Sequence, residues 1–497
     1  MDLHKLRVLV IGYYNHFNLG DEQYKWTIMH LLKRVFYKKI HLPEITFIDC
    51  DLLKTYQVQP NTMVILGGGD VLNHYFLDSI CNKFMNSPPV SIIALSVGIP
   101  YDDIFMDPEQ RKKLQILDHI FLRTQQDLNK LNKYVTKPAV HYLPDTSCFA
   151  MDCLQNVQNY IFTQSFRIQY QKIQSISKNY QRAKLLRTDP DVMVEGFYTS
   201  DKPRKIIGIM WCRHIYHPES PYRENYLEIV KSFASLMDDL IQKQYSIVMI
   251  PFNTKSTKKG EKHDVNKEND VLIQRDVMKF VQPSSHAYIC NIEETLSLEQ
   301  TMYLYKQFYL AIPMRFHATL FSVYSGVPMI PIYTTKKIRN FLLDIQWPYD
   351  NVLEKNNKDL PTRFDKNAWW NTFTQLTDPV NYLNMKRQLL HVSNYFKQKS
   401  IEQTSLIRQC MEDASTTLAS PTTASSPNAT VLRSASTPPK VATGNSHCEL
   451  LGEACNNGVL ASSACRGLMT STLGSSTVKE PTTFCPKGKK PFKTSLS

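Results

Sequence analysis

The alternation of hydrophobic and polar segments along the chain predicts two successive blocks of strands and helices. Short apolar runs rich in β-branched residues are typical of buried parallel strands, and stretches with helical periodicity lie between many of them. In the first block, strands are expected at 6–12, 45–48, 62–66, 90–97, 119–122 and 140–143, and helices at about 21–34, 109–117 and 125–131. This order indicates a parallel sheet with crossover helices.

The same alternation resumes further along the chain. Strands are expected at 205–211, 246–250, 287–290, 308–311 and 329–332, and helices at about 222–243, 270–281, 297–305 and 316–325. Residues 151–204, between the blocks, are rich in Gln, Asn, Ser and Tyr and are expected to form a helical linker or insertion. We therefore predict an α/β fold with two Rossmann-like, doubly wound domains, at residues 1–150 and at residues 205–413, where trailing helices complete the second.

The final segment, residues 414–497, differs from the rest in composition. Ser, Thr, Pro, Ala and Gly dominate it, and it contains two Phe and no Tyr or Trp. Such a segment cannot bury enough apolar surface to offset the entropy lost on ordering the chain, so we expect a disordered C-terminal tail.

The net charge of +13 is compatible with nucleic acid binding, but its distribution argues against that partner. The tail carries eight Lys/Arg and three Asp/Glu, and the remaining excess is diffuse, without a basic stripe. Diffuse positive charge fits an enzyme with an anionic substrate. The eleven cysteines include no CxxC pair, and no signal-peptide pattern or apolar run of transmembrane length is visible. We therefore expect mostly free thiols, no transmembrane segment and a cytoplasmic location.

Polar residues concentrate in the loop predicted between the first strand and the first helix. Asn18, Gly20, Asp21 and Glu22 lie there, at the carboxyl edge of the sheet, where open α/β folds bind ligands. Gly20 permits close backbone approach, and either carboxylate could hold or deprotonate a hydroxyl group. Carboxylates at this position also cap helices, so a purely structural role for Asp21 stays open. The loop lacks the GxGxxG pattern of dinucleotide sites.

Three consecutive glycines follow a neighbouring strand of the first block. Gly67, Gly68 and Gly69, with Asp70 after them, are expected to form a turn beyond the strand at 62–66. Such a turn lets a ligand or a second domain approach the backbone, although a tight turn with no further role fits equally well.

Cationic residues follow the strands of the second block. Arg213 comes two residues after one strand, Arg315 and His317 lie at the entry to a helix, and Lys336 lies beyond the last strand. Because the carboxyl ends of parallel strands meet at one edge, we expect these side chains to converge. Arg binds phosphate and carboxylate bidentately, helix N-termini favour anions, and His transfers protons near neutral pH. Taken singly, Arg213 could be a surface arginine, and Arg315 and His317 could be satisfied within the helix entry. Their convergence predicts an anion site in the second domain.

In this order the motifs resemble those of the polysaccharide pyruvyltransferase family. The family pattern is Asn-x-Gly-Asp-Glu, a Gly-rich turn, an Arg, a Pro-Asp pair, and Arg-x-His-Ala followed by Gly-x-Pro and Lys. The matching residues here are Asn18 to Glu22, Gly67 to Gly69, Arg123, Pro144 with Asp145, Arg315 to Ala318, Gly326 to Pro328, and Lys336. The agreement covers roughly residues 6–347 and omits the segment near 151–203 and the tail.

The resemblance implies a GT-B-like fold with its active site in the cleft between the two domains. It also implies an enzyme that transfers the pyruvyl group of phosphoenolpyruvate, its donor substrate, onto a pair of hydroxyls on a sugar or glycan acceptor. The donor ligands would be Arg213, Arg315 and Lys336, the acid or phosphate-orienting group His317, and the acceptor-side residues Asp21, Glu22 and Asp145. No metal-ligand cluster is visible in the sequence, so no metal or other cofactor is expected.

Two other functions fit parts of the sequence. A GT-B glycosyltransferase with a nucleotide-sugar donor would share the fold, but it would normally hold the ribose with a carboxylate where Lys336 and Lys337 stand here. A non-catalytic sugar-binding protein is suggested by Thr124, which replaces an Asp of the family pattern, and by the long tail. The presence of Arg315 and His317 argues against that second alternative.

Overall fold

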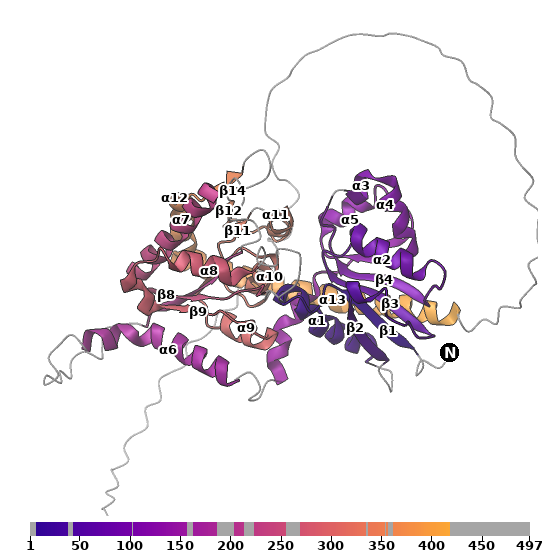
Figure 1. Ribbon diagram of the computed structural model, residues 1–497, viewed down its shortest axis with the longest axis horizontal. Coiled ribbons are helices and arrows are strands. Elements are labelled where there is room, and N and C mark those ends of the chain that lie inside the picture. The colour runs from indigo at the N-terminus through magenta and orange to yellow at the C-terminus, as the bar shows by residue number, and fades with distance from the viewer. Residues whose placement is uncertain are drawn as a thin grey trace, which may run out of the picture. The chain divides into compact units, whose positions relative to one another are not determined.

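The structure is a computed structural model that describes residues 6–37, 43–101, 103–156, 163–185, 203–212, 223–254, 269–333, 336–352, 354–355 and 361–417. Within these ranges the chain forms two α/β lobes, each built on a parallel sheet (Figure 1). The predicted disorder of the tail falls outside the described residues.

The first lobe contains a six-stranded sheet with the order β2-β1-β3-β4-β5-β6. All of its neighbouring strands pair in parallel. Its elements are β1 (Arg7–Gly12), α1 (Leu19–Val35), β2 (Glu44–Asp49), η2 (Cys50–Leu52), β3 (Thr62–Gly69), α2 (His74–Phe84), β4 (Ser91–Val97), α3 (Asp103–Met106), α4 (Pro108–Lys113), η3 (Leu114–Ile116), β5 (His119–Leu122), α5 (Gln125–Leu131) and β6 (Ala139–Tyr142).

The second lobe contains a four-stranded parallel sheet with the order β10-β7-β8-β9. It is entered through η4 (Thr146–Asn156), which begins before the predicted linker, and α6 (Gln164–Leu185), which lies within it. Its elements are β7 (Lys205–Met210), α7 (Arg223–Gln242), β8 (Tyr245–Met249), α8 (Asp270–Met278), η6 (Pro283–Tyr288), β9 (Ile289–Asn291), α9 (Leu298–Tyr305), β10 (Leu310–Pro313), α10 (Phe316–Tyr324), β11 (Ile332–Tyr333), α11 (Lys336–Asp344), β12 (Asn351–Val352), β13 (Glu354–Lys355), β14 (Pro361–Arg363), α12 (Lys366–Thr377) and α13 (Pro379–Thr417).

The predicted two-block α/β architecture is confirmed, and the differences have local causes. The strand expected at 329–332 is reduced to a bridge between Met329 and Ala311 and the short β11. Pro328 and Pro331 explain this, because proline donates no ladder hydrogen bond. The strand expected at 287–290 starts at Ile289, since the preceding residues form a 3-10 turn that opens with Pro283.

The glycine run is part of a strand rather than a turn beyond it. β3 continues through Gly67 and Gly68 to Gly69, and all three residues are buried. Gly68 and Gly69 have φ values of +71° and +87°, so the backbone is left-handed there. A side chain at Gly68 would collide with the ring of Tyr24 on α1. The glycines therefore let α1 pack directly against the end of β3.

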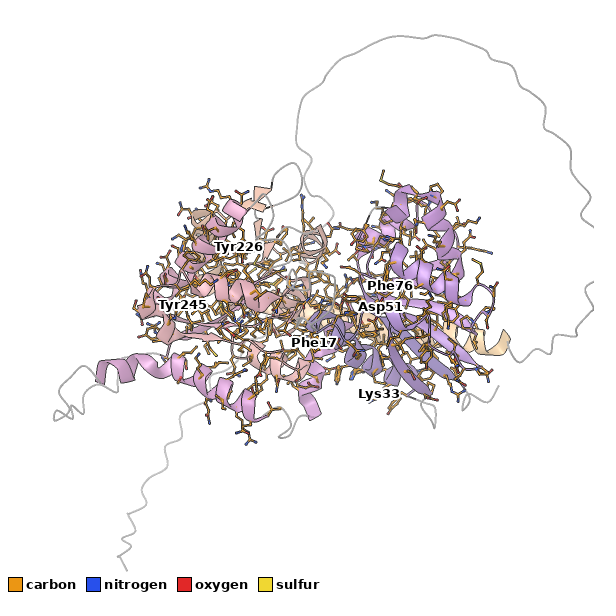
Figure 2. The ribbon with its side chains drawn as sticks, in the orientation of Figure 1. Phe17, Lys33, Asp51, Phe76, Tyr226 and Tyr245 are labelled. Carbon is orange, nitrogen blue, oxygen red and sulfur yellow. The ribbon has the colours of Figure 1, made fainter. Side chains whose placement is uncertain are left out.

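The two lobes share apolar packing as well as polar contacts. Val8 and Val10 of β1 belong to the same core cluster as Ile207 and Ile209 of β7. Figure 2 shows the side chains of both lobes, with Phe76 in the first and Tyr226 and Tyr245 in the second. Helix α13, which follows the second lobe in sequence, returns to the first lobe, where Arg408 Nε donates to the carbonyl of Val35 at 2.6 Å. The burial of apolar side chains in this shared core is the main interaction that holds the two lobes together.

Replacing Gly68 by Ala should destabilise the fold more than replacing Gly69. Both substitutions impose a left-handed residue, at about 1–2 kcal/mol. Only Gly68→Ala also places a Cβ 2.3 Å from the Tyr24 ring, whereas the nearest atom at Gly69 is 3.4 Å away. Overpacking of this kind costs about a further 1–3 kcal/mol. Urea unfolding of both variants measures the difference, and equal losses would show that the contact with Tyr24 does not matter.

Candidate active site

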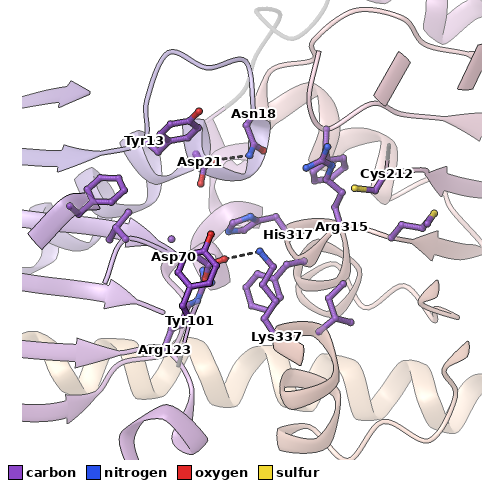
Figure 3. A pocket seen from close by; sticks show the side chains of 17 residues that line it. Tyr13, Asn18, Asp21, Asp70, Tyr101, Arg123, Cys212, Arg315, His317 and Lys337 are labelled. Carbon is purple, nitrogen blue, oxygen red and sulfur yellow. Dashed lines mark hydrogen bonds and ion pairs between the residues drawn. The ribbon is translucent and has the colours of Figure 1, made fainter. Parts of the chain in front are cut away.

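A cavity of about 360 Å³ lies between the lobes, at the carboxyl ends of the strands of both sheets (Figure 3). Three cationic side chains, two carboxyls and a histidine line it. They are Asp21, Asp70 and Arg123 from the first lobe, and Arg315, His317 and Lys337 from the second. Two segments separated by hundreds of residues thus build one site.

A tyrosine hydroxyl joins the two lobes beside this cavity. Tyr24 on α1 donates to Asp145 Oδ2 at 2.6 Å and accepts from Arg123 Nη1 at 2.9 Å. Its third neighbour is His317 Nε2 at 3.0 Å, from the N-terminal turn of α10. Because the single proton of the hydroxyl is given to Asp145, the network is satisfied when His317 carries its proton on Nε2 and donates it to Tyr24.

His317 is held as a neutral side chain with only 13% of its surface exposed. Burial lowers its pKa to about 4; Asp145 opposes this fall, while Arg123 and Lys337 add to it. The ring lies directly against the backbone of Gly20, where a Cβ would come within 2.2 Å of Nδ1. Gly20 therefore has the close-approach role expected of it, and what approaches is the histidine of the other lobe.

Asp70 links the lobes by a second polar contact. It binds Arg123 through Oδ1 and Lys337 through Oδ2, the latter at 2.7 Å. Burial alone would raise the pKa of Asp70, but Lys337 and Arg123 outweigh burial and hold this pKa well below the usual range. The ring of Phe316 lies under both cations, with centroid distances of 4.5 Å to Arg123 and 5.7 Å to Lys337. The carboxylate thus stays ionised and fixes both cations at the cavity wall.

Asp21 is the lining carboxyl with the opposite behaviour. It lies in the first turn of α1, whose N-cap is Asn18, so Asp21 is not the cap. Asn18 Nδ2 donates to Asp21 Oδ2 at 2.6 Å. Burial raises the pKa of Asp21 to about 7; Lys337 opposes the rise and Asp70 adds to it. A carboxyl that titrates near neutral pH inside a cavity is suited to general acid or base catalysis.

Arg315 is anchored by a carboxylate that the sequence did not single out. Its Nε and Nη2 donate to Asp270 Oδ2 and Oδ1 at 2.9 and 2.6 Å. Asp270 is fully buried at the start of α8 and also accepts from the backbone amides of Phe252 and Asn253. The same loop contacts the first lobe, since the amide of Leu19 donates to the carbonyl of Phe252 at 2.8 Å. Arg315 is therefore fixed in place at the cavity wall.

The other predicted site residues have different locations. Glu22 does not line the cavity and pairs with Lys25 at 2.7 Å. Asp145 is buried behind the lining, where it holds Tyr24 and Arg123. Gly69 lines the cavity, whereas Gly67 and Gly68 serve packing. Arg213 and the side chain of Lys336 lie outside the described residues.

Five residues of the network were not among the site residues predicted from the sequence: Tyr24, Asp70, Arg123, Asp270 and Lys337. Arg123 had been noted only as part of the family pattern, Asp70 only beside the glycine run, and Lys337 only against a nucleotide-sugar donor. Asp70 and Arg123 follow β3 and β5, so the rule that parallel strand ends meet at one edge could have assigned them to the site. No sequence pattern indicated a site role for Tyr24, because its position fits the apolar face of the predicted helix. Asp270 follows no strand directly, and its pairing with Arg315 depends on tertiary structure.

One group outside the cavity has the composition of a metal site. Ligand atoms of His16, Asp49 and Asp51 lie within 4.8 Å of one another. Protein hydrogen bonds already use these groups: Asp49 accepts from His16 Nε2 at 2.8 Å and from the amides of Tyr14 and Asp51, and Asp51 accepts from Tyr75. The cluster is explained without an ion.

None of the helices in the described ranges is long and apolar enough to cross a bilayer. The cytoplasmic location stays a prediction from the sequence.

Two doubly wound lobes around a cavity lined by anchored cations form a GT-B-like fold. The chain belongs to the polysaccharide pyruvyl transferase family, whose family model matches residues 18–336. The resemblance of the motifs is thereby confirmed, and the protein is a transferase. No curated protein matches the sequence significantly.

Several solved structures resemble the fold at low identity. A putative UDP-N-acetylglucosamine 2-epimerase from Listeria monocytogenes has a TM-score of 0.46 and 12% identity, with 86% of this chain and 100% of that chain covered. UDP-GlcNAc 2-epimerase from Neisseria meningitidis, bound to UDP-GlcNAc, has a TM-score of 0.45 and 13% identity, with 82% and 100% covered. An α,α-trehalose-phosphate synthase (UDP-forming) from Burkholderia vietnamiensis has a TM-score of 0.46 and 10% identity, with 83% and 98% covered. At such scores the ligands of those proteins say nothing about the donor used here.

Tyr24→Phe should destabilise the protein, because it leaves the Nε2 proton of His317 and one Arg123 donor without their acceptor. The loss of a buried partner costs about 1–3 kcal/mol. Tyr245→Phe is the matched control, since no hydrogen bond to the Tyr245 hydroxyl is found among the described residues, and its change should stay within about 0.5 kcal/mol. Urea unfolding followed by circular dichroism makes the comparison. Equal stability of Tyr24→Phe and wild type would mean that the hydroxyl does not join the lobes.

Proposed function

We propose that the protein transfers the pyruvyl group of phosphoenolpyruvate to two hydroxyls of one sugar residue, forming a pyruvate ketal. The observation that carries the proposal is the meeting of Arg123, Arg315 and Lys337 at one cavity with Asp21, whose pKa is about 7. Phosphoenolpyruvate places a phosphate and a carboxylate on three carbons, so it needs several fixed cations and one proton donor at short range.

The donor would bind to cations that are already held in position. Carboxylates fix all three: the buried Asp270 holds Arg315, and the partly buried Asp70 holds Arg123 and Lys337. The N-terminus of α10, which the side chain of its N-cap residue Arg315 does not cap, adds backbone donors next to Arg315. Preorganised cations of this kind lose little free energy to reorganisation when an anion binds. Arg213 and Lys336 remain proposed donor ligands.

Asp21 is the proposed acid. Its protonated carboxyl would give a proton to C3 of the enol, which becomes a methyl group, while the first sugar hydroxyl attacks C2. Cleavage of the C2–O bond then releases phosphate, and the second hydroxyl closes the ring. Of the two hydroxyl protons, one restores Asp21 and the other leaves with phosphate. A bound anion would favour the protonated form of Asp21 further, since like charges nearby raise the pKa of a carboxyl.

His317 has a supporting role in this proposal. Its pKa of about 4 leaves it neutral at pH 7, and its Nε2 faces Tyr24, so it is a weaker acid candidate than Asp21. We propose that it orients the N-terminal turn of α10 toward the phosphate. No metal or other cofactor is invoked, because charge stabilisation comes from the cations of the chain. The family also favours pyruvyl transfer over the nucleotide-sugar and non-catalytic alternatives.

Purified protein should release phosphate from phosphoenolpyruvate only in the presence of a sugar acceptor, with or without a chelator. Arg315→Ala should lower kcat/KM for phosphoenolpyruvate at least about tenfold, because charged hydrogen bonds contribute about 1.5–3 kcal/mol. Arg275→Ala, on the exposed side of the same lobe, is the control. Wild-type rates in Arg315→Ala, or a rate abolished by chelation, would contradict the proposed donor site.

The pH dependence tests the role of Asp21. A general acid works only while protonated, so kcat/KM should fall as the pH rises through about 7, the pKa of Asp21. Asp21→Asn should lower kcat at least about a hundredfold and remove this fall. Glu22→Gln, one residue along the same helix but outside the cavity, should keep both rate and profile. A profile that rises through pH 7, or normal turnover in Asp21→Asn, would exclude Asp21 as the acid.

A further inference from the structure

The loop between β1 and α1 brings a tyrosine to the donor cavity that has no role in the chemistry described above. Tyr13 follows directly on β1 and lines the cavity together with Asn18 and Asp21. Figure 3 shows Tyr13 and Asp21 on the first-lobe side of the cavity. The half-buried ring of Tyr13 packs against the apolar core of the first lobe. Because a tyrosine in such a place keeps its apolar body against the core, its polar tip is the part suited to meet a ligand.

A histidine of the same loop supports the ring of Tyr13. The rings of Tyr13 and His16 are stacked, with centroids 3.7 Å apart and planes inclined by 3°. His16 Nε2 lies 2.8 Å from Asp49 Oδ2, and it donates there because a carboxylate only accepts. Asp49, the last residue of β2, also accepts from the amides of Tyr14 and Asp51, at 3.0 and 2.8 Å. A continuous chain of contacts therefore runs from the end of β2 through His16 to Tyr13.

Backbone strain on both sides of His16 shows that the loop conformation is imposed by its surroundings. Asn15 and Phe17 are non-glycine residues with φ values of +66° and +55°. Such conformations cost free energy, persist where other contacts enforce them, and cluster at ligand sites. Here Lys25 Nζ donates to Asn15 Oδ1 at 2.8 Å, and the amide of Thr254 in the second lobe donates to the carbonyl of Phe17 at 3.2 Å. The loop is thus fixed before and after His16.

A neutral hydrogen-bond donor suits this wall of the cavity. Positive charge is already supplied by Arg123, Arg315 and Lys337, each of which is paired with a carboxylate. A further cation beside Asp21 would lower the pKa of that carboxyl, which is about 7, and would weaken it as a proton donor near neutral pH. The phenol of Tyr13 adds a donor without adding charge.

We propose that Tyr13 is a donor-binding residue whose hydroxyl donates to an anionic group of phosphoenolpyruvate, and that His16, held by Asp49, is the positioning residue that keeps Tyr13 in place. This inference rests on the proposed function, because it needs phosphoenolpyruvate in the cavity. Asp21 remains the acid, and Tyr13 contributes binding rather than a proton.

Calorimetric titration with phosphoenolpyruvate tests both parts. Tyr13→Phe removes only the hydroxyl and should weaken binding about tenfold or more, as expected for a hydrogen bond to a charged group. His16→Ala removes the stacked ring and should weaken binding about threefold or more. His16→Phe returns a ring to the stack without the bond to Asp49 and should restore binding close to that of wild type. Tyr37→Phe, at an exposed tyrosine outside the cavity, is the control and should bind as wild type does.

A double variant shows whether His16 acts through Tyr13. If it does, Tyr13→Phe and His16→Ala combined should bind no more weakly than Tyr13→Phe alone, whereas additive losses would contradict the positioning role. Circular dichroism at the titration temperature verifies that each variant is folded. Should His16→Ala be unfolded, His16→Gln takes its place with the same expected loss, because it keeps a donor for Asp49 but lacks the ring.

The outcomes separate this inference from the proposed function. If phosphoenolpyruvate does not bind wild type, the proposed function fails. If it binds wild type, and Arg315→Ala weakens binding but Tyr13→Phe does not, the donor site stands and the role of Tyr13 is wrong. If Tyr13→Phe weakens binding but His16→Ala binds as wild type does, positioning by His16 is overturned.

Discussion

The hydroxyl of Tyr24 is the contact on which the geometry of the site depends. One oxygen atom meets Asp145 and Arg123 from the first lobe and His317 from the second. Because these partners are buried, none can replace the hydroxyl with water at low cost. The N-terminal turn of α10 is therefore held at a set position against the first lobe. Because Arg315 lies two residues before His317, the same contact positions Arg315 at the cavity.

Burial also divides the carboxyls of the site into two kinds. Asp145 is buried and Asp70 is partly buried next to cations, and the pKa values of both carboxyls are lowered despite the cost of desolvation. Asp21 is only partly exposed at the cavity wall, its direct partner is the neutral amide of Asn18, and desolvation raises its pKa. Neighbouring carboxyls with pKa values pushed in opposite directions are the usual arrangement of a site in which one acts as an acid and others hold charge. The assignment of Asp21 follows from this contrast.

The sequence predicted the succession of strands and helices well, but it predicted the polar network of the site only in part. Apolar β-branched runs such as 6–12 identify parallel strands, because burial on both faces leaves little choice of residue. Strand-end logic also led to Arg315, His317 and Asp21. It did not lead to Lys337, which lines the cavity one residue after the predicted Lys336. Tyr24 and Asp270 act through partners distant in sequence, and no local pattern marks such pairs.

The fate of the proton on C3 tests the central claim most directly. The reaction is run in D₂O with phosphoenolpyruvate and an accepted hexoside, and the methyl group of the product is examined by NMR and mass spectrometry. Protonation of C3 by an exchangeable carboxyl predicts a pyruvate ketal with one deuterium in its methyl group and one inorganic phosphate released per ketal. A phosphorylated sugar, or a ketal whose methyl group contains no deuterium, would contradict the account.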